Sequence, residues 1–115
     1  MRDAVEFMEL ACTVTQAPDL DELSLMFGGA RLWSGRMEPG TTASVGLIKA
    51  MPRESGVIKL WQINGTERAL TGLGRHRVAA TDDDPADEGA GVRTARFTRD
   101  GAEYALTYRV LRIPG

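Results

Sequence analysis

The sequence contains few of the side chains on which metal sites, disulfides and catalytic triads depend. Its 115 residues include one cysteine, Cys12, and one histidine, His76. One cysteine excludes an internal disulfide and a zinc site built from several cysteines, and one histidine excludes a multi-histidine metal site within a single chain. Motifs with fixed glycine spacing, such as the phosphate-binding Walker loop, are also missing. We therefore expect no cofactor and no metal.

Long apolar runs are missing as well. No stretch approaches the ~20 apolar residues of a membrane helix, and charges at positions 2, 3, 6 and 9 interrupt the apolar stretch that a secretory signal needs. With 43% hydrophobic residues and a net charge of -2, the composition is that of a folded chain rather than a disordered one. We expect one soluble, cytoplasmic domain that spans residues 1–115 and has no membrane partner.

The small net charge hides a strong segregation of charges. Residues 1–30 carry -5, residues 31–81 carry +5, residues 82–88 carry -5 and residues 89–115 carry +3. The two basic segments are the ones whose pattern is mostly that of strands. A basic stripe of this kind attracts nucleic acid or small anions, although simply solvated arginines are the plainer interpretation.

The dipeptide Asp100-Gly101 marks the clearest element of the sequence, a β-hairpin. Such a dipeptide accepts the positive φ angles of a two-residue turn. Counting outward pairs Phe97 with Tyr104 and Arg93 with Tyr108, which makes one face aromatic and apolar and the other polar. We predict a half-buried antiparallel hairpin.

A second hairpin is predicted around Asn64-Gly65. Segments 57–63 and 66–72 flank this dipeptide, and a two-residue turn places Trp61 opposite Arg68. Apolar residues lie on both faces of this hairpin, so both faces need cover. A closed barrel, a sandwich or a homodimer interface supplies such cover, and we expect a homodimer.

One short helix is predicted before these hairpins. Asp19 is a suitable N-cap, and Gly28-Gly29 is a suitable helix end. Leu20, Leu23 and Phe27 then form the buried stripe of the helix.

The other segments are predicted as strands. Residues 8–14 alternate as a strand does, although a helix also fits; residues 30–37 and 42–51 pair across the turn 38–41; and residues 75–81 form a further strand. A meander of this kind hides its edges by rolling up. The predicted fold is therefore mainly β, at the border of α+β: an antiparallel up-and-down β-barrel or strongly curved meander of 7–8 strands with one short N-terminal helix.

Aromatic and basic side chains on the predicted inner faces suggest a binding site. Trp61, Tyr104 and Tyr108 carry polar atoms that need partners inside a barrel, and a ligand can provide them. Arg68 lies where it would contact Trp61 or a carboxylate, and His76 lies on the face opposite Arg75 and Arg77. We predict a small binding protein with an apolar or aromatic ligand in this cavity, although a filled core is the plainer interpretation of any one aromatic.

Two other functions fit the same residues. The strand arginines, with stacking aromatics on an exposed basic sheet, would suit a nucleic-acid or polyanion-binding module, particularly for single strands. A small cyclase- or isomerase-like enzyme that shapes its substrate would use His76 or a tyrosine as acid or base.

Overall fold

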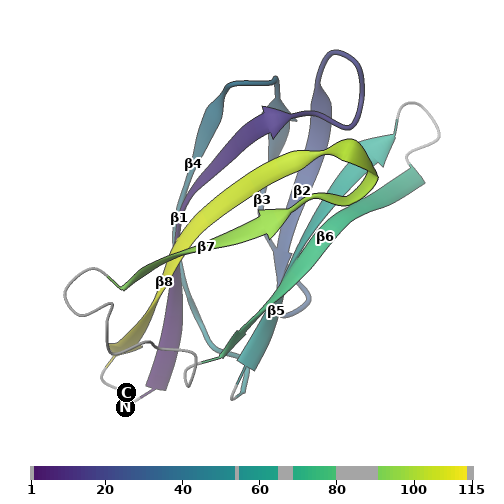
Figure 1. Ribbon diagram of the computed structural model, residues 1–115. Helices are drawn as coiled ribbons and strands as arrows, with labels where there is room; N and C mark the ends of the chain where they lie inside the picture. The colour runs from purple at the N-terminus through teal and green to yellow at the C-terminus, as the bar shows by residue number, and fades with distance from the viewer. Residues whose placement is uncertain (1, 54, 65–68, 80–90, 114–115) are drawn as a thin grey trace.

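The computed structural model describes residues 2–53, 55–64, 69–79 and 91–113 (Figure 1). In this part of the chain there is no α-helix, and thus no helix that could cross a membrane. A short 3₁₀ helix, η3 (Arg99–Gly101), connects the last two strands. The strands are β1 (Arg2–Val14), β2 (Asp21–Phe27), β3 (Ala30–Met37), β4 (Thr42–Ala50), β5 (Ser55–Asn64), β6 (Ala69–Ala79), β7 (Val92–Phe97) and β8 (Glu103–Ile113). The prediction of a mainly β, antiparallel fold is confirmed.

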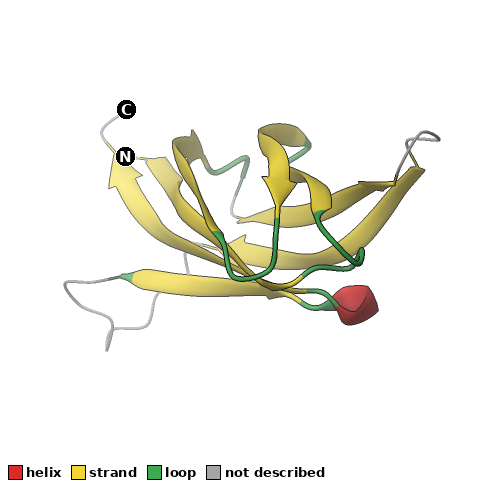
Figure 2. Cartoon of the chain, turned by 90° about the horizontal axis from the view of Figure 1, so that it is seen from above, coloured by secondary structure: helices red, strands yellow, loops and turns green. Residues whose placement is uncertain are grey.

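The strands form two four-stranded antiparallel sheets, with the orders β4-β1-β8-β7 and β3-β2-β5-β6. Figure 2 shows the sheets curving around a common interior. Three hairpins, β2–β3, β5–β6 and β7–β8, stay within one sheet, and the other connections pass from one sheet to the other. The chain is therefore a sandwich with edge strands rather than the predicted closed barrel.

The turn between β3 and β4 explains why the predicted pairing of these two strands is wrong. The Gly40 amide donates to the Cys12 carbonyl at 2.8 Å, and the Cys12 amide donates to the Thr41 carbonyl at 2.9 Å. These two bonds attach the turn to β1, so β4 continues along β1 while β3 stays paired with β2. The chain changes sheets at the place where the sequence suggested a hairpin.

The predicted N-terminal helix is also wrong, because residues 21–27 form strand β2. Asp21, Leu23, Leu25 and Phe27 are all buried, which is the two-residue period of a strand. The helical pattern used Leu20, which is exposed, and overlooked the alternation because Asp21 is an unusual core residue.

The two hairpin predictions have different outcomes. In β7–β8 the predicted register is confirmed: Phe97 pairs with Tyr104 and Arg93 with Tyr108. Asp100 and Gly101 have φ of 54° and 81°, as a type I′ turn requires. In β5–β6, Trp61 pairs with Gly72 and not with Arg68, which lies outside the described residues.

Buried side chains from both sheets meet in one core. Phe7 and Phe27 pack edge to face across it, with ring centroids 5.1 Å apart. Gly74 has a φ of 149°, and a Cβ there would lie 3.1 Å from the Phe97 backbone of the opposite sheet. Side-chain volume in the core therefore limits which residue is tolerated at position 74. The other large buried residues include Val5, Leu10, Leu23, Leu25, Ile58, Leu60, Leu73, Val78 and Leu106.

Candidate functional site

The structure separates the residues that were predicted to share one site. His76, Tyr104 and Tyr108 point into the space between the sheets, whereas Trp61 lies on the outward face of the β3-β2-β5-β6 sheet. Arg68 is outside the described residues. Two places therefore need separate consideration: a buried polar cluster and an outer surface around Trp61.

The buried cluster centres on Asp21, a fully buried carboxylate at the start of β2. Its oxygens accept hydrogen bonds from the backbone amides of Gln16 and Ala17, at 2.8 and 2.9 Å. They also accept from Nε2 of Gln62 at 2.8 Å and from the hydroxyl of Tyr104 at 2.5 Å. One carboxylate thus joins the β1–β2 connection to β5 and to β8 of the other sheet.

The surroundings of this cluster suppress the reactivity of its titratable groups. Burial, followed by the hydrogen bonds to Asp21 and Cys12, raises the pKa of Tyr104 far above its usual value. Burial also raises the pKa of the Cys12 thiol, against a lowering effect of its hydrogen bond with Tyr104. Both groups keep their protons at neutral pH, and a protonated buried thiol is a poor nucleophile. The cluster has the properties of a structural network.

His76 and Tyr108 form a second contact between the sheets. Nε2 of His76 lies 3.0 Å from the Tyr108 hydroxyl, and the two rings meet edge to face at 5.8 Å. His76 faces away from Arg75 and Arg77, as the alternation predicted. The histidine therefore has a protein partner, as expected of a histidine that contributes to packing.

The outward face around Trp61 combines a large aromatic ring with basic side chains. On β5 and β6 the cross-strand pairs that point outward are Val57 with Arg77, Lys59 with Arg75, Trp61 with Gly72 and Ile63 with Leu70. Three atoms of the Trp61 ring lie within 3.4–3.9 Å of where a Gly72 Cβ would be, so the indole covers the glycine. The absence of a side chain at position 72 leaves room for the ring on the sheet surface.

Exposed bases lie near this ring on β3, β5 and β6 and in two turns. Outward positions on the strands provide four arginines and a lysine, and the adjoining turns provide two more arginines. We call this surface the basic face: Arg31, Arg36, Arg53, Lys59, Arg75, Arg77 and Arg99, with Trp61 among them. All seven bases are exposed. At the described outward positions of these four strands, Glu22 is the one acid.

No described carboxylate forms a salt bridge with any of these seven bases. On the other sheet, in contrast, Arg109 is paired with Glu6 at 2.5 Å and Arg112 with Asp3 at 3.4 Å. Among the described residues, the basic face therefore carries an excess of positive charge, with Glu22 opposite Arg36 as its one described acid.

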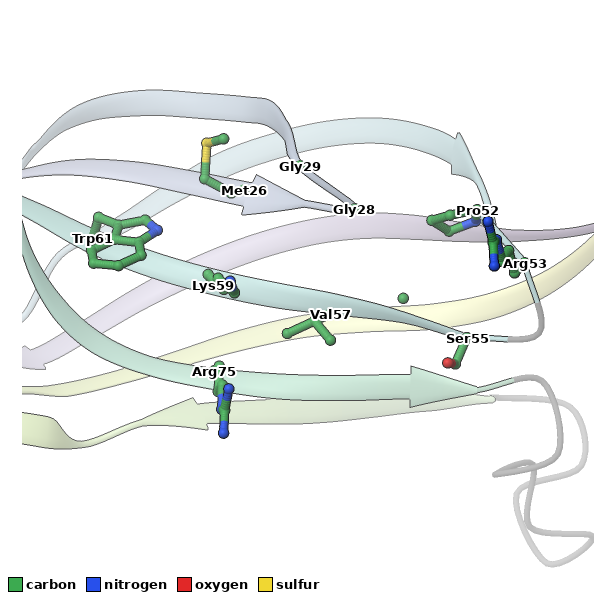
Figure 3. Close-up of a pocket in the computed structure, with 11 residues that line it drawn as sticks. Met26, Gly28, Gly29, Pro52, Arg53, Ser55, Val57, Lys59, Trp61 and Arg75 are labelled. Atoms are coloured by element: carbon green, nitrogen blue, oxygen red, sulfur yellow. The ribbon is translucent and has the colours of Figure 1, made fainter.

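Three hollows on the basic face have Trp61 in their lining. The largest has a volume of about 470 Å³ and extends from Trp61 and Met26, past Lys59 and Val57, to Arg53 in the β4–β5 turn (Figure 3). A second, of about 270 Å³, lies between Trp61 and Arg99, and a third of the same size lies on the Arg31 side of the ring. Trp61 lines all three of these hollows.

The sequence pattern pointed to Trp61 but placed it on an inner face, and it pointed to the strand arginines only in general. It gave no sign of the buried Asp21 and Gln62 or of the outward position of Lys59 beside Trp61. The described residues contain no group of three His, Cys, Asp or Glu side chains that could hold a metal ion. No protein-family model matches this chain. The curated proteins contain no significant match to it either.

Proposed function

We propose that this protein binds a polyanion through the basic face. The observation that carries the proposal is the cross-strand pair of Lys59 and Arg75 beside Trp61. Like charges placed directly opposite each other destabilise a sheet. A feature that breaks a local rule without a compensating contact is typical of functional sites, and a bound anion would remove the repulsion.

The charge distribution supports an extended anion over a single small one. Seven bases and one acid occupy the described basic face, although the whole chain has a net charge of -2. The bases lie on three of the four strands, β3, β5 and β6, and in two adjoining turns. A chain of phosphates or sulfates can contact several of them at once and release its condensed counterions.

A second copy of this chain is a poor partner for the same surface. An interface around a twofold axis brings identical patches together, so Lys59 and Arg75 of one copy would approach those of the other. Like charges that meet across an interface disfavour association. Charge complementarity therefore supports an anionic partner.

The test is the binding of a fluorescently labelled single-stranded 12-mer to the full chain at several salt concentrations. If four to seven bases contact phosphates, the slope of log K against log salt is about -3 to -5. Lys59→Glu is expected to weaken binding fivefold to tenfold or more at about 50 mM salt and to reduce the slope. The same variant converts the repulsive pair with Arg75 into an attractive one, so its fold is expected to be at least as stable.

Arg96→Glu is the matched control, because Arg96 is an exposed arginine on the outward face of the other sheet. The control is expected to bind like the wild type. No binding of the wild type at low salt, or equal losses in Lys59→Glu and Arg96→Glu, would refute the proposal.

A small aromatic ligand is the second candidate function. The hollow beside Trp61 has a volume of about 470 Å³, within the range of small-molecule sites. Titration of the indole fluorescence with small aromatic acids tests this candidate, and Trp61→Leu is expected to abolish the signal change. The enzyme alternative stays a prediction.

A further inference from the structure

We infer that the polyanion is a single-stranded nucleic acid and that Trp61 stacks on one of its bases. This inference rests on the proposed function, because it concerns the same surface. It adds a recognition element that charge alone does not provide.

The position of Trp61 is suited to stacking. Its indole covers Gly72, so the sheet backbone supports the ring, while the ring also lines three open hollows. The side chain is only partly buried. A tryptophan that served only to fill a core would have its ring among buried side chains, as Phe7 and Phe27 have theirs.

Both apolar and basic side chains line the hollows beside the ring, and a nucleotide chain offers contacts for both kinds. Lys59 and Arg75 line the hollows on one side of Trp61, and Arg31 lines the hollow on the other. Met26, Ile63 and Leu70 border the same ring, and Leu70 is 59% exposed. Apolar side chains add no affinity for a polymer that presents only anionic groups. They do add affinity for a nucleic acid, because they pack against the faces of its nucleobases. Single-strand binding proteins combine these two features, a cationic surface and an aromatic stacking platform.

The geometry favours a single strand over a duplex. The bases of a duplex are already stacked on each other, and a protein reaches their edges with elements that enter a groove. Trp61 instead lies on the sheet surface at its pairing position with Gly72. A nucleobase must be unstacked from its neighbours and unpaired before it can reach the Trp61 ring.

The experiment compares two labelled 12-mers with the same number of phosphates, oligothymidylate and an abasic strand, on the full-length chain. Loss of one stacked base costs about fivefold to a hundredfold in affinity, and the wild type is expected to prefer oligothymidylate by that factor. Trp61→Leu is expected to lose this preference and to bind both strands as the wild type binds the abasic one. Trp61→Phe, which keeps an aromatic face, is expected to retain most of it. A ribo-oligonucleotide with the same bases distinguishes RNA from DNA.

The outcomes separate this inference from the proposed function. Salt-dependent binding that is equal for the two 12-mers would overturn stacking on Trp61 and leave the polyanion proposal intact. Stronger binding of a 12-base-pair duplex that Trp61→Leu does not change would also overturn it. No binding of any strand at low salt would refute both. If Trp61→Leu fails to fold, two other measurements test the stacking. Oligothymidylate is then expected to quench the wild-type indole fluorescence more strongly than the abasic strand, and Trp61→Phe is expected to keep most of the preference for oligothymidylate.

Discussion

Replacement of Tyr104 by phenylalanine measures the strength of the buried cluster that holds the two sheets together. The hydroxyl donates to Oδ2 of Asp21 at 2.5 Å, and Tyr104 is 2% exposed. A hydrogen bond to a charged group contributes ~1.5–3 kcal/mol. Phenylalanine keeps the packing of the ring, and Oδ2 keeps its bond from the Gln16 amide. We expect urea denaturation at pH 7 to show a loss of about 2 kcal/mol with an unchanged m-value.

The pH dependence of the same variant tests the protonation state of Tyr104. Its pKa in the folded chain is raised above the ordinary value of 10.0. Above pH 10 the unfolded chain therefore gives up a proton that the folded chain keeps. The stability that the neutral phenol contributes is fully present below pH 10 and is lost as the pH rises, at about 1.4 kcal/mol per pH unit.

Between pH 9 and pH 11 the wild type is thus expected to lose about 1.4 kcal/mol more than the Tyr104→Phe variant. The comparison cancels the titration of the groups whose pKa does not depend on Tyr104. Cys12 is the exception, because its hydrogen bond with Tyr104 lowers its pKa, so both proteins are compared in a Cys12→Ala background. A difference between the two proteins that stays constant from pH 9 to pH 11, or a loss below about 0.5 kcal/mol at pH 7, would refute the buried hydrogen bond. Asp21→Asn, made alone and together with Tyr104→Phe, completes a double-mutant cycle. The expected coupling free energy between the two side chains is about 1–3 kcal/mol.

Two further predictions concern packing and assembly. Gly74→Ala is expected to destabilise the fold by about 1–3 kcal/mol in thermal denaturation, because its Cβ would lie 3.1 Å from Phe97. Gly29→Ala is its control, since Gly29 also has a positive φ but no atom lies within 4 Å of its Cβ position; an equal cost in both variants would exclude the steric cause. The homodimer stays a prediction, although charge repulsion disfavours the basic face as its interface. Light scattering would support a homodimer with twice the chain mass of 12.5 kDa and contradict it with 12.5 kDa itself.

Local signals in the sequence were sufficient where the interaction is local. The β7–β8 register follows from Asp100-Gly101, because a two-residue turn determines which residues face each other on the adjoining strands. The same reasoning failed at Asn64-Gly65, where Asn64 pairs with Ala69 and four residues lie between them. A turn signal by itself does not state the length of the loop.

The candidate site shows the same division between local and non-local information. Alternation along β5 separates Trp61 from its buried neighbours Leu60 and Gln62, but it did not reveal which face is outward. Trp61 was predicted on an inner face, and the structure places it on the outward face. The neighbours of that face, such as Met26 and Arg31, come from strands whose pairing depends on long-range contacts. No pattern within either segment indicates that they lie next to Trp61.

The sequence by itself determined a β-rich chain with one well-defined hairpin and an excess of bases on the predicted strands. Only the tertiary structure decided that the chain forms two sheets, that Asp21 lies in the core, and that Trp61 faces outward among the bases. The physical reason is that strand formation follows from local alternation, whereas sheet order depends on contacts between residues far apart in the chain. The Asp21–Tyr104 bond, which joins residues 83 positions apart, is one such contact.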